Sequence, residues 1–192
     1  IDRWVAVSAL AALAQFRQHG RDVVFSINLS GDCFEDDTFL DLVRAQVQGN
    51  GLPPGSVVFE VTEQTAVRFL ETANAGIQGL LELGCRFALD DFGKGFSSFS
   101  CLKHLPVDII KIDGSFVENL VKDSVDQAMV RSIVGIARAL DKRTVAEFVQ
   151  DGQTLALLRE LGVDYVQGHY LGSPSEQLPS GRLPGKQLRA VS

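Results

Sequence analysis

Six short apolar runs, separated by segments with helical periodicity, are the feature of this 192-residue chain that most constrains its fold. Each run has the length and composition of a buried strand. The predicted strands cover residues 23–28, 57–61, 86–90, 108–112, 144–147 and 165–167. Short apolar strands that alternate with helices indicate parallel strands covered by helices on both sides. The sequence therefore predicts an α/β protein.

Two parallel architectures match this alternation, an open doubly wound sheet and a (β/α)8 barrel of the TIM type. No Gly-x-Gly-x-x-Gly or P-loop sequence follows any predicted strand, which disfavours a nucleotide-binding open sheet. The chain enters a helical pattern at Ile1 without an initiator methionine, so we expect a piece of a longer protein. We predict an incomplete barrel of about six βα units over residues 1–174, followed by a Pro/Gly/Ser-rich tail over 175–192.

Composition excludes several classes of protein. The chain is 45% hydrophobic and 22% charged, which suits one globular domain with a large core. Its net charge of −6, with Lys and Arg spread singly, argues against DNA or RNA as a partner. The apolar runs are too short to cross a bilayer, so we expect no membrane insertion of this segment. We expect this segment to be cytoplasmic, even where the parent protein is anchored in a membrane. Cys33, Cys85 and Cys101 form no Cys-x-x-Cys pair and suggest reduced thiols.

Each predicted strand ends in a polar or charged side chain. These side chains are Asn28, Glu60, the adjacent pair Asp90 and Asp91, Lys111, Glu147 and Gln167. In a (β/α)8 barrel they would meet at the face where active sites are assembled. Neighbouring carboxylates repel each other unless a positive charge lies between them, and oxygen ligands without nearby His or Cys favour Mg²⁺ or Mn²⁺ over zinc. Two such metals sharing one aspartate would promote attack of water on a phosphodiester.

Taken singly, these residues have ordinary structural explanations. Two adjacent aspartates most often open a solvated turn. Asn28 could cap a strand end, and Glu60 could be a charge on a core strand. Lys111 could be a solvated strand end and Gln167 a loop contact. Glu63 could be an acid in the first turn of a helix, where the helix dipole favours it. Their joint placement at one barrel face is what favours a functional site.

Six motifs resemble those of the EAL domain in order and spacing. They are Asn28-Leu-Ser30, Glu60-Val-Thr-Glu63, Asp90-Asp-Phe-Gly93, Lys111-Ile-Asp113, Ala146-Glu147 and Gln167-Gly168. This family comprises bacterial cyclic di-GMP phosphodiesterases and degenerate relatives that bind the nucleotide without cleaving it. The resemblance covers residues 1 to about 174 and implies a (β/α)8 barrel. The strand that carries the Glu-Ala-Leu tripeptide, with a metal-binding carboxylate and a nearby arginine, would precede Ile1.

The resemblance also implies two divalent cations, Mg²⁺ or Mn²⁺. Asn28, Glu60 and Asp90 resemble the ligands of one metal. Asp90, Asp91 and Glu147 resemble the ligands of the second, with Asp90 as the bridge.

Three further residues resemble parts of the catalytic machinery. Lys111 resembles the residue that holds the attacking water and helps to deprotonate it, and its ammonium can offset charge at phosphorus. Gln167 resembles an amide that hydrogen-bonds within the substrate and water network. Glu63 resembles the carboxylate that anchors the loop at residues 92–97.

Within the matched region, the chain departs from the family pattern in two places. Ala146-Glu-Phe-Val-Gln150 stands where relatives have Ala-Glu-Gly-Val-Glu, so a carboxylate becomes Gln150 and a glycine becomes Phe148. Phe148 removes backbone freedom and places a bulky ring. Lys94 and Phe96 replace a small residue and a tyrosine, which adds a cation beside an acidic site.

Three functions remain open at this point. The first is metal-dependent hydrolysis of cyclic di-GMP to linear pGpG in bacterial second-messenger signalling, which the retained strand-end set favours. The second is a non-catalytic cyclic di-GMP receptor, which Gln150, Lys94 and Phe148 favour. The third is a structural interaction module. We further expect fusion to upstream sensor or GGDEF-type domains, and a homodimer.

Overall fold

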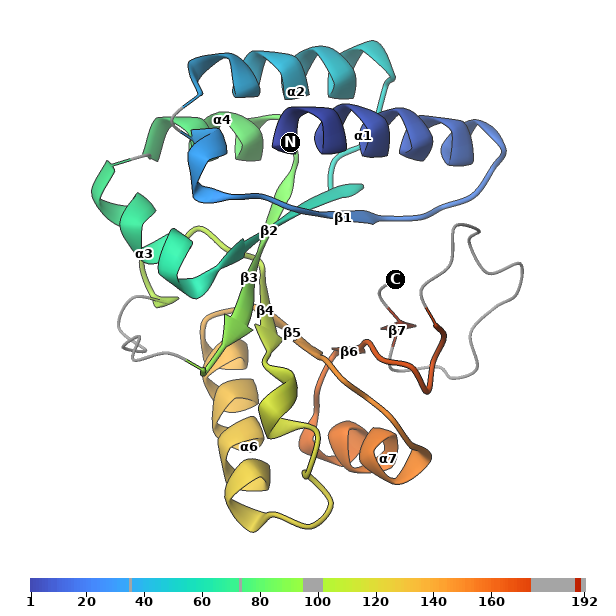
Figure 1. Cartoon of the computed structure of the whole chain (residues 1–192), viewed down its shortest axis with the longest axis vertical. Coiled ribbons are helices and arrows are strands. Elements are labelled where there is room, and N and C mark those ends of the chain that lie inside the picture. The colour runs from blue at the N-terminus through green and yellow to red at the C-terminus, as the bar shows by residue number, and fades with distance from the viewer. Residues whose placement is uncertain (35, 73, 95–101, 174–188, 191–192) are drawn as a thin grey trace. The chain divides into compact units, whose positions relative to one another are not determined.

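The computed structural model describes residues 1–34, 36–72, 74–94, 102–173 and 189–190. The chain divides into two compact units (Figure 1). The first unit comprises the described residues within 1–89 and 97–107, and the second those within 90–96 and 108–192. The division falls inside strand β3 (Arg86–Phe92), between Leu89 and Asp90.

The first unit is built on parallel strands β1 (Phe25–Asn28) and β2 (Val57–Thr62). Helix α1 (Asp2–Gln18) packs against β1 and against α2 (Asp37–Gly49), and α2 packs against α4 (Asn74–Glu82). Figure 1 shows these three helices side by side. The short helix η1 (Gly31–Phe34) follows β1, and α3 (Glu63–Thr72) follows β2.

Aromatic and aliphatic side chains fill the first unit. The rings of Phe39 and Phe59 lie 6.3 Å apart, and those of Phe59 and Phe87 lie 5.9 Å apart. Leu10 and Leu13 of α1 are fully buried. This apolar core holds the strands that carry the polar strand ends. Among the described helices, none combines the length and the apolar character that crossing a membrane requires.

The second unit continues the parallel pattern. Strand β4 (Ile109–Ile112) pairs with β5 (Arg143–Ala146), and β5 pairs with β6 (Tyr165–Val166). Helix η2 (Gly114–Phe116) follows β4. Helix α6 (Ser124–Ala139) packs against β4, β5 and α7 (Gly152–Leu161). The two-residue strand β7 (Arg189–Ala190) lies in the segment predicted as a tail and pairs in parallel with β6.

Helix boundaries in the second unit follow from capping chemistry. Asp151 accepts a hydrogen bond from the Thr154 N–H at 2.7 Å and opens α7, and Gly162 ends it in the left-handed conformation at φ 84°. The sequence Ser124-x-x-Gln127 predicts a capping box at the start of α6, but the box does not form. The Asp123 carboxylate accepts from the first backbone N–H groups of α6 instead. The Gln127 amide donates to the Leu120 carbonyl at 2.9 Å and is therefore directed elsewhere.

The helical pattern that follows the strand at 57–61 predicts one helix reaching Leu83, whereas the structure assigns two helices there, α3 and α4. Residue 73, between them, lies outside the described residues. Helical periodicity runs through both segments, so the pattern alone predicts a single element.

Two glycines should respond oppositely to alanine. A Cβ on Gly168 would lie 2.3 Å from the backbone N and O of Val149, whereas a Cβ on Gly135, inside α6, would meet nothing within 4 Å. We expect Gly168→Ala to lower the free energy of unfolding by about 2 kcal/mol or more, because backbone must move. Gly135→Ala should raise it by about 0.5–1 kcal/mol through helix propensity. Urea denaturation of both variants checks this, and equal effects would contradict the close approach at Gly168.

The thiols of Cys33 and Cys85 are buried and free. Burial, with a smaller contribution from Asp2, raises the pKa of Cys33 to about 12, and burial raises the pKa of Cys85 to about 11. Both should therefore resist iodoacetamide at pH 8 in the folded chain and react after denaturation. Because unfolding restores the ordinary pKa of 9.0, stability should fall as the pH rises above that value. Peptide mass spectrometry measures the alkylation; rapid native labelling would contradict the burial.

Candidate metal and catalytic site

Three carboxylates come together in the second unit. Asp90 and Asp91 belong to the last part of β3, and Glu147 follows β5 directly. One oxygen from each carboxylate lies within 4.8 Å of the others. All three side chains are partly exposed, so a ligand from solvent can reach them. The clustering agrees with the prediction that acids at the ends of parallel strands lie close together.

The backbone at Asp91 explains how two consecutive residues reach one cluster. Successive side chains of a regular strand point to opposite faces. Asp91 has φ 53°, the left-handed conformation, which breaks this alternation. Aspartate is among the non-glycine residues that tolerate it best. The local turn thus lets both carboxylates serve the same site.

A buried lysine bridges two of these carboxylates. Lys111, on β4, has only 6% of its side chain exposed. Its Nζ lies 2.7 Å from Asp90 Oδ1 and 2.8 Å from Glu147 Oε1. Three carboxylates against one ammonium leave a formal charge of −2. A buried ammonium is retained only where anions surround it, so the lysine and the acids stabilise one another.

Asp113 belongs to the same cluster, although the sequence interpretation gave it no role. It lies two residues after Lys111, and its carboxylate accepts from the Ser115 N–H at 2.9 Å and opens η2. It also hydrogen-bonds with Asp91. Lys111 and Asp113 have the period-two spacing of residues on one face of a strand, and that spacing is the signal that identifies Asp113.

The pKa values of Asp91 and Asp113 move in opposite directions. The pKa of Asp91 is raised, first by burial, then by the charge of Asp90 and the hydrogen bond with Asp113. Burial acts to raise the pKa of Asp113 as well, but hydrogen bonds from Ser115 and the charge of Lys94 outweigh it, so that this pKa is lowered. The pair therefore holds a shared proton more readily on Asp91.

Residues that depart from the family pattern have separate environments. Lys94 is 67% exposed, and its Nζ lies 3.6 Å from Asp113 Oδ2. Gln150 is exposed to solvent. Phe96 and Cys101 lie outside the described residues. Lys94 thus contacts the edge of the acidic cluster through Asp113.

Gln167 follows β6 and lies beside the end of β5. Its N–H donates to the Ala146 carbonyl at 2.8 Å, and its own carbonyl accepts from Val149 at 3.0 Å. These backbone bonds connect it to the residues on either side of Glu147 and Phe148. The close approach of Gly168 to Val149 holds the same connection.

The other predicted residues belong to the first unit. Asn28 ends β1 and is opposite Glu60 of β2 in the parallel register. The Leu29 N–H donates to the Glu60 carbonyl at 2.9 Å, which continues the pairing. Glu60 and Glu63 are each 5% exposed, and Glu63 is the first residue of α3. Shared coordination of one metal by Asn28, Glu60 and Asp90 remains a prediction.

The donor set of the second unit fits a hard divalent cation. Its ligand atoms would be carboxylate oxygens, which Mg²⁺ and Mn²⁺ prefer, and the cluster carries excess negative charge that such a cation would neutralise. Asp90, Asp91 and Glu147 would hold it.

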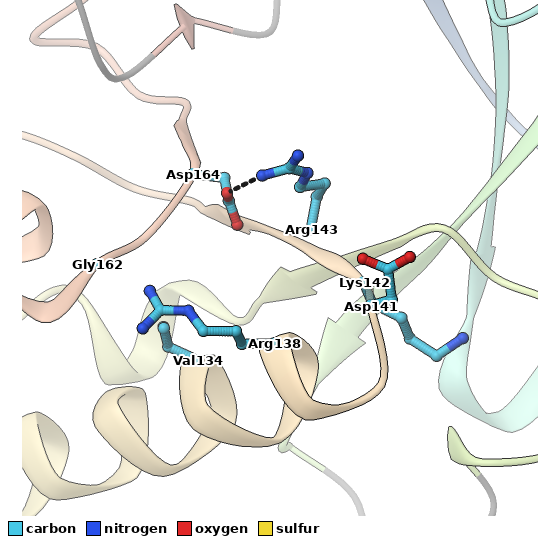
Figure 2. Close-up of a pocket in the computed structure, with 7 residues that line it drawn as sticks. All are labelled: Val134, Arg138, Asp141, Lys142, Arg143, Gly162 and Asp164. Carbon is cyan, nitrogen blue, oxygen red and sulfur yellow. Dashed lines mark hydrogen bonds and ion pairs between the residues drawn. The ribbon is translucent and has the colours of Figure 1, made fainter.

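A separate pocket of about 110 Å³ lies at the amino-terminal ends of β5 and β6, whereas Glu147 and Gln167 follow their carboxyl ends (Figure 2). Arg143 there pairs with Asp164 at 2.9 Å, and Arg138, Asp141 and Lys142 also line it. Its mixture of cations and anions does not resemble the acidic cluster.

The parallel α/β architecture places acids and a lysine at the carboxyl ends of its strands, the edge at which the sites of such folds are assembled. The sequence model of the EAL domain matches residues 1–174. The chain belongs to the EAL domain family.

Relatives and a solved structure agree with this membership. Cyclic di-GMP phosphodiesterase PdeB of Shewanella oneidensis is 39% identical over 91% of this chain and 20% of its own length. The bifunctional diguanylate cyclase/cyclic di-GMP phosphodiesterase MucR of Pseudomonas aeruginosa is 35% identical over 99% of this chain and 27% of its own length. The chain thus spans about a quarter or less of these relatives.

The FimX EAL domain from Pseudomonas aeruginosa, solved bound to c-di-GMP, matches with a TM-score of 0.84 and 33% identity. The match covers 92% of this chain and 71% of that one. The prediction of an incomplete (β/α)8 barrel of the EAL type is confirmed by this likeness.

Metal binding by the acidic cluster should stabilise the folded chain. At a Mn²⁺ concentration of about 100 times Kd, the gain is roughly 2.7 kcal/mol, or several degrees in Tm. Asp90→Asn should remove most of that shift, because Asp90 contributes to the cluster and pairs with Lys111. Differential scanning fluorimetry with and without Mn²⁺ measures it.

Asp41→Asn provides the matched control, because Asp41 is exposed on α2 and pairs only locally with Arg44. It should keep the full Mn²⁺ shift. An equal shift in wild type and in Asp90→Asn would show that Mn²⁺ binds elsewhere.

Proposed function

We propose that this chain is the catalytic part of a metal-dependent phosphodiesterase that opens cyclic di-GMP to linear pGpG. One observation carries the proposal: the Lys111 ammonium contacts both Asp90 and Glu147 within a cluster of three carboxylates at strand ends. Related proteins named as cyclic di-GMP phosphodiesterases support the choice of substrate. This hydrolysis would lower the level of the second messenger cyclic di-GMP in a bacterial cell.

Divalent cations, when bound, would polarise the scissile phosphate and lower the pKa of the attacking water. The carboxylates of Asp90, Asp91 and Glu147 would hold one cation. Asn28, Glu60 and Asp90 would hold the second, so that Asp90 serves both. Because burial and the charge of Asp90 raise the pKa of Asp91, a cation at this cluster would compete with a proton there as the pH falls. Asp113 accepts hydrogen bonds beside Asp91 and orients it.

Lys111 would position water and stabilise charge. Its Nζ is already fixed by two carboxylates, so little side-chain freedom is lost when it donates to an oxygen of the reacting phosphate or to the attacking water. Its positive charge would offset the negative charge that develops at phosphorus. Gln167 would hydrogen-bond within the substrate and water network from the end of β6, and Glu63 would hold the loop that follows Asp91.

A non-catalytic receptor is the second candidate, and a specific observation favours it. The Lys111 ammonium offsets part of the negative charge of Asp90 and Glu147, which helps the site to persist without metal. The exposed Gln150 supplies no carboxylate where the EAL pattern has one. In this case the nucleotide would bind and signal without being cleaved.

The wider setting belongs to the same proposal. Residues 1–174 would form the EAL part and residues 175–192 a tail. The chain would work in the cytoplasm, joined to upstream sensor or GGDEF-type domains and paired as a homodimer. The bifunctional relative MucR supports fusion to a cyclase.

The full-length protein, incubated with Mg²⁺ or Mn²⁺ and cyclic di-GMP, should produce linear pGpG detectable by liquid chromatography. Lys111→Ala should lower turnover by roughly 100-fold or more, since charge stabilisation of this type is typically worth that much, while much of the nucleotide binding remains. Lys111→Gln is a second variant with a smaller risk of misfolding, because its amide can still donate to a neighbouring carboxylate.

Lys122→Ala, at an exposed lysine after η2, is the matched control and should keep full turnover. Full activity of Lys111→Ala would refute the assigned role. Absence of product, together with tight binding that survives chelation of metal, would establish the receptor instead.

A further inference from the structure

Phe148 has a strained backbone and an exposed ring. Its φ is 60°, a left-handed value that is unfavourable for a bulky side chain and natural for glycine. The side chain recovers little of this cost by burial, because Phe148 is 57% exposed. Strain that the surrounding core does not repay is characteristic of binding sites.

The ring is nevertheless held in place. A Cβ added to Gly114, the first residue of η2, would lie 2.6 Å from Phe148 Cδ2 and 2.8 Å from its Cγ. One part of the ring therefore packs against a bare backbone while the rest faces solvent. An anchored aromatic ring offers a flat surface to a ligand with a small loss of conformational entropy.

The chain connects this ring to the acidic cluster on both sides. Phe148 follows Glu147, whose carboxylate contacts Lys111 at 2.8 Å. Gly114, on which the ring packs, follows Asp113, which hydrogen-bonds with Asp91. An exposed aromatic surface thus adjoins a group of residues suited to metal and phosphate. A nucleotide presents both a phosphate and a planar base.

We propose that Phe148 is a ligand-binding residue on which a purine base of the bound nucleotide stacks. This inference rests on the proposed function, because it takes the phosphate of the same ligand to lie at the Asp90–Asp91–Glu147 cluster. Stacking uses the face of the base and therefore adds affinity whichever purine is present. It also supplies the burial that the exposed ring lacks in the free chain.

The test is calorimetric titration of the full-length protein, in the presence of Mn²⁺, with a phosphorothioate analogue of cyclic di-GMP that resists hydrolysis. Phe148→Gly and Phe148→Leu should each bind roughly 5- to 150-fold more weakly, the range expected for one lost base-stacking contact. Phe148→Trp should bind at least as tightly as wild type. Tm of Phe148→Gly should equal or exceed that of wild type, because glycine relieves the left-handed strain.

Trp4→Leu is the matched control, since Trp4 is an aromatic residue on α1 with 74% exposure, and it should leave affinity unchanged. Unchanged affinity in both Phe148→Gly and Phe148→Leu, with tight binding by wild type, would overturn this inference and leave the proposed function standing. No binding by wild type would overturn the proposed function itself, and this inference with it.

Discussion

The contact of the Lys111 ammonium with Asp90 and Glu147 is the interaction on which the site depends. These groups come from three strands, β3, β4 and the end of β5, so their contact fixes the strand ends relative to each other within the second unit. Removing the lysine would leave partly buried carboxylates to repel one another, at a cost of about 3–5 kcal/mol. A bound cation would relieve the same repulsion. Stability and metal binding are therefore linked at this point.

Backbone conformation decides which side chains surround that contact. The left-handed turn at Asp91 brings consecutive carboxylates to one side, and Asp113 then holds Asp91 through a hydrogen bond. A second left-handed residue, Phe148, follows Glu147 and exposes its ring. Of the three described non-glycine residues with a left-handed φ, Asp91 and Phe148 belong to or adjoin the acidic cluster, whereas Asp141 lies in the turn before β5.

The sequence predicted the parallel α/β architecture well, because apolar strands such as 57–61 and 108–112 differ clearly from amphipathic helices. It also predicted Asp90, Asp91, Lys111 and Glu147 as neighbours, since parallel strands end at one edge. Local competition was harder to foresee. Asp123 caps α6 in place of Ser124, and Asp113, which its spacing from Lys111 could have indicated, joins the site through a hydrogen bond with Asp91.

A divalent cation held by the Asp90, Asp91 and Glu147 carboxylates is central to the proposed function. The most direct test is a crystal of the full-length protein soaked in Mn²⁺, with diffraction recorded at the manganese absorption edge. We expect an anomalous peak within coordination distance of all three carboxylates. A fully soaked crystal with no peak there, while Lys111 retains its contacts with Asp90 and Glu147, would contradict it.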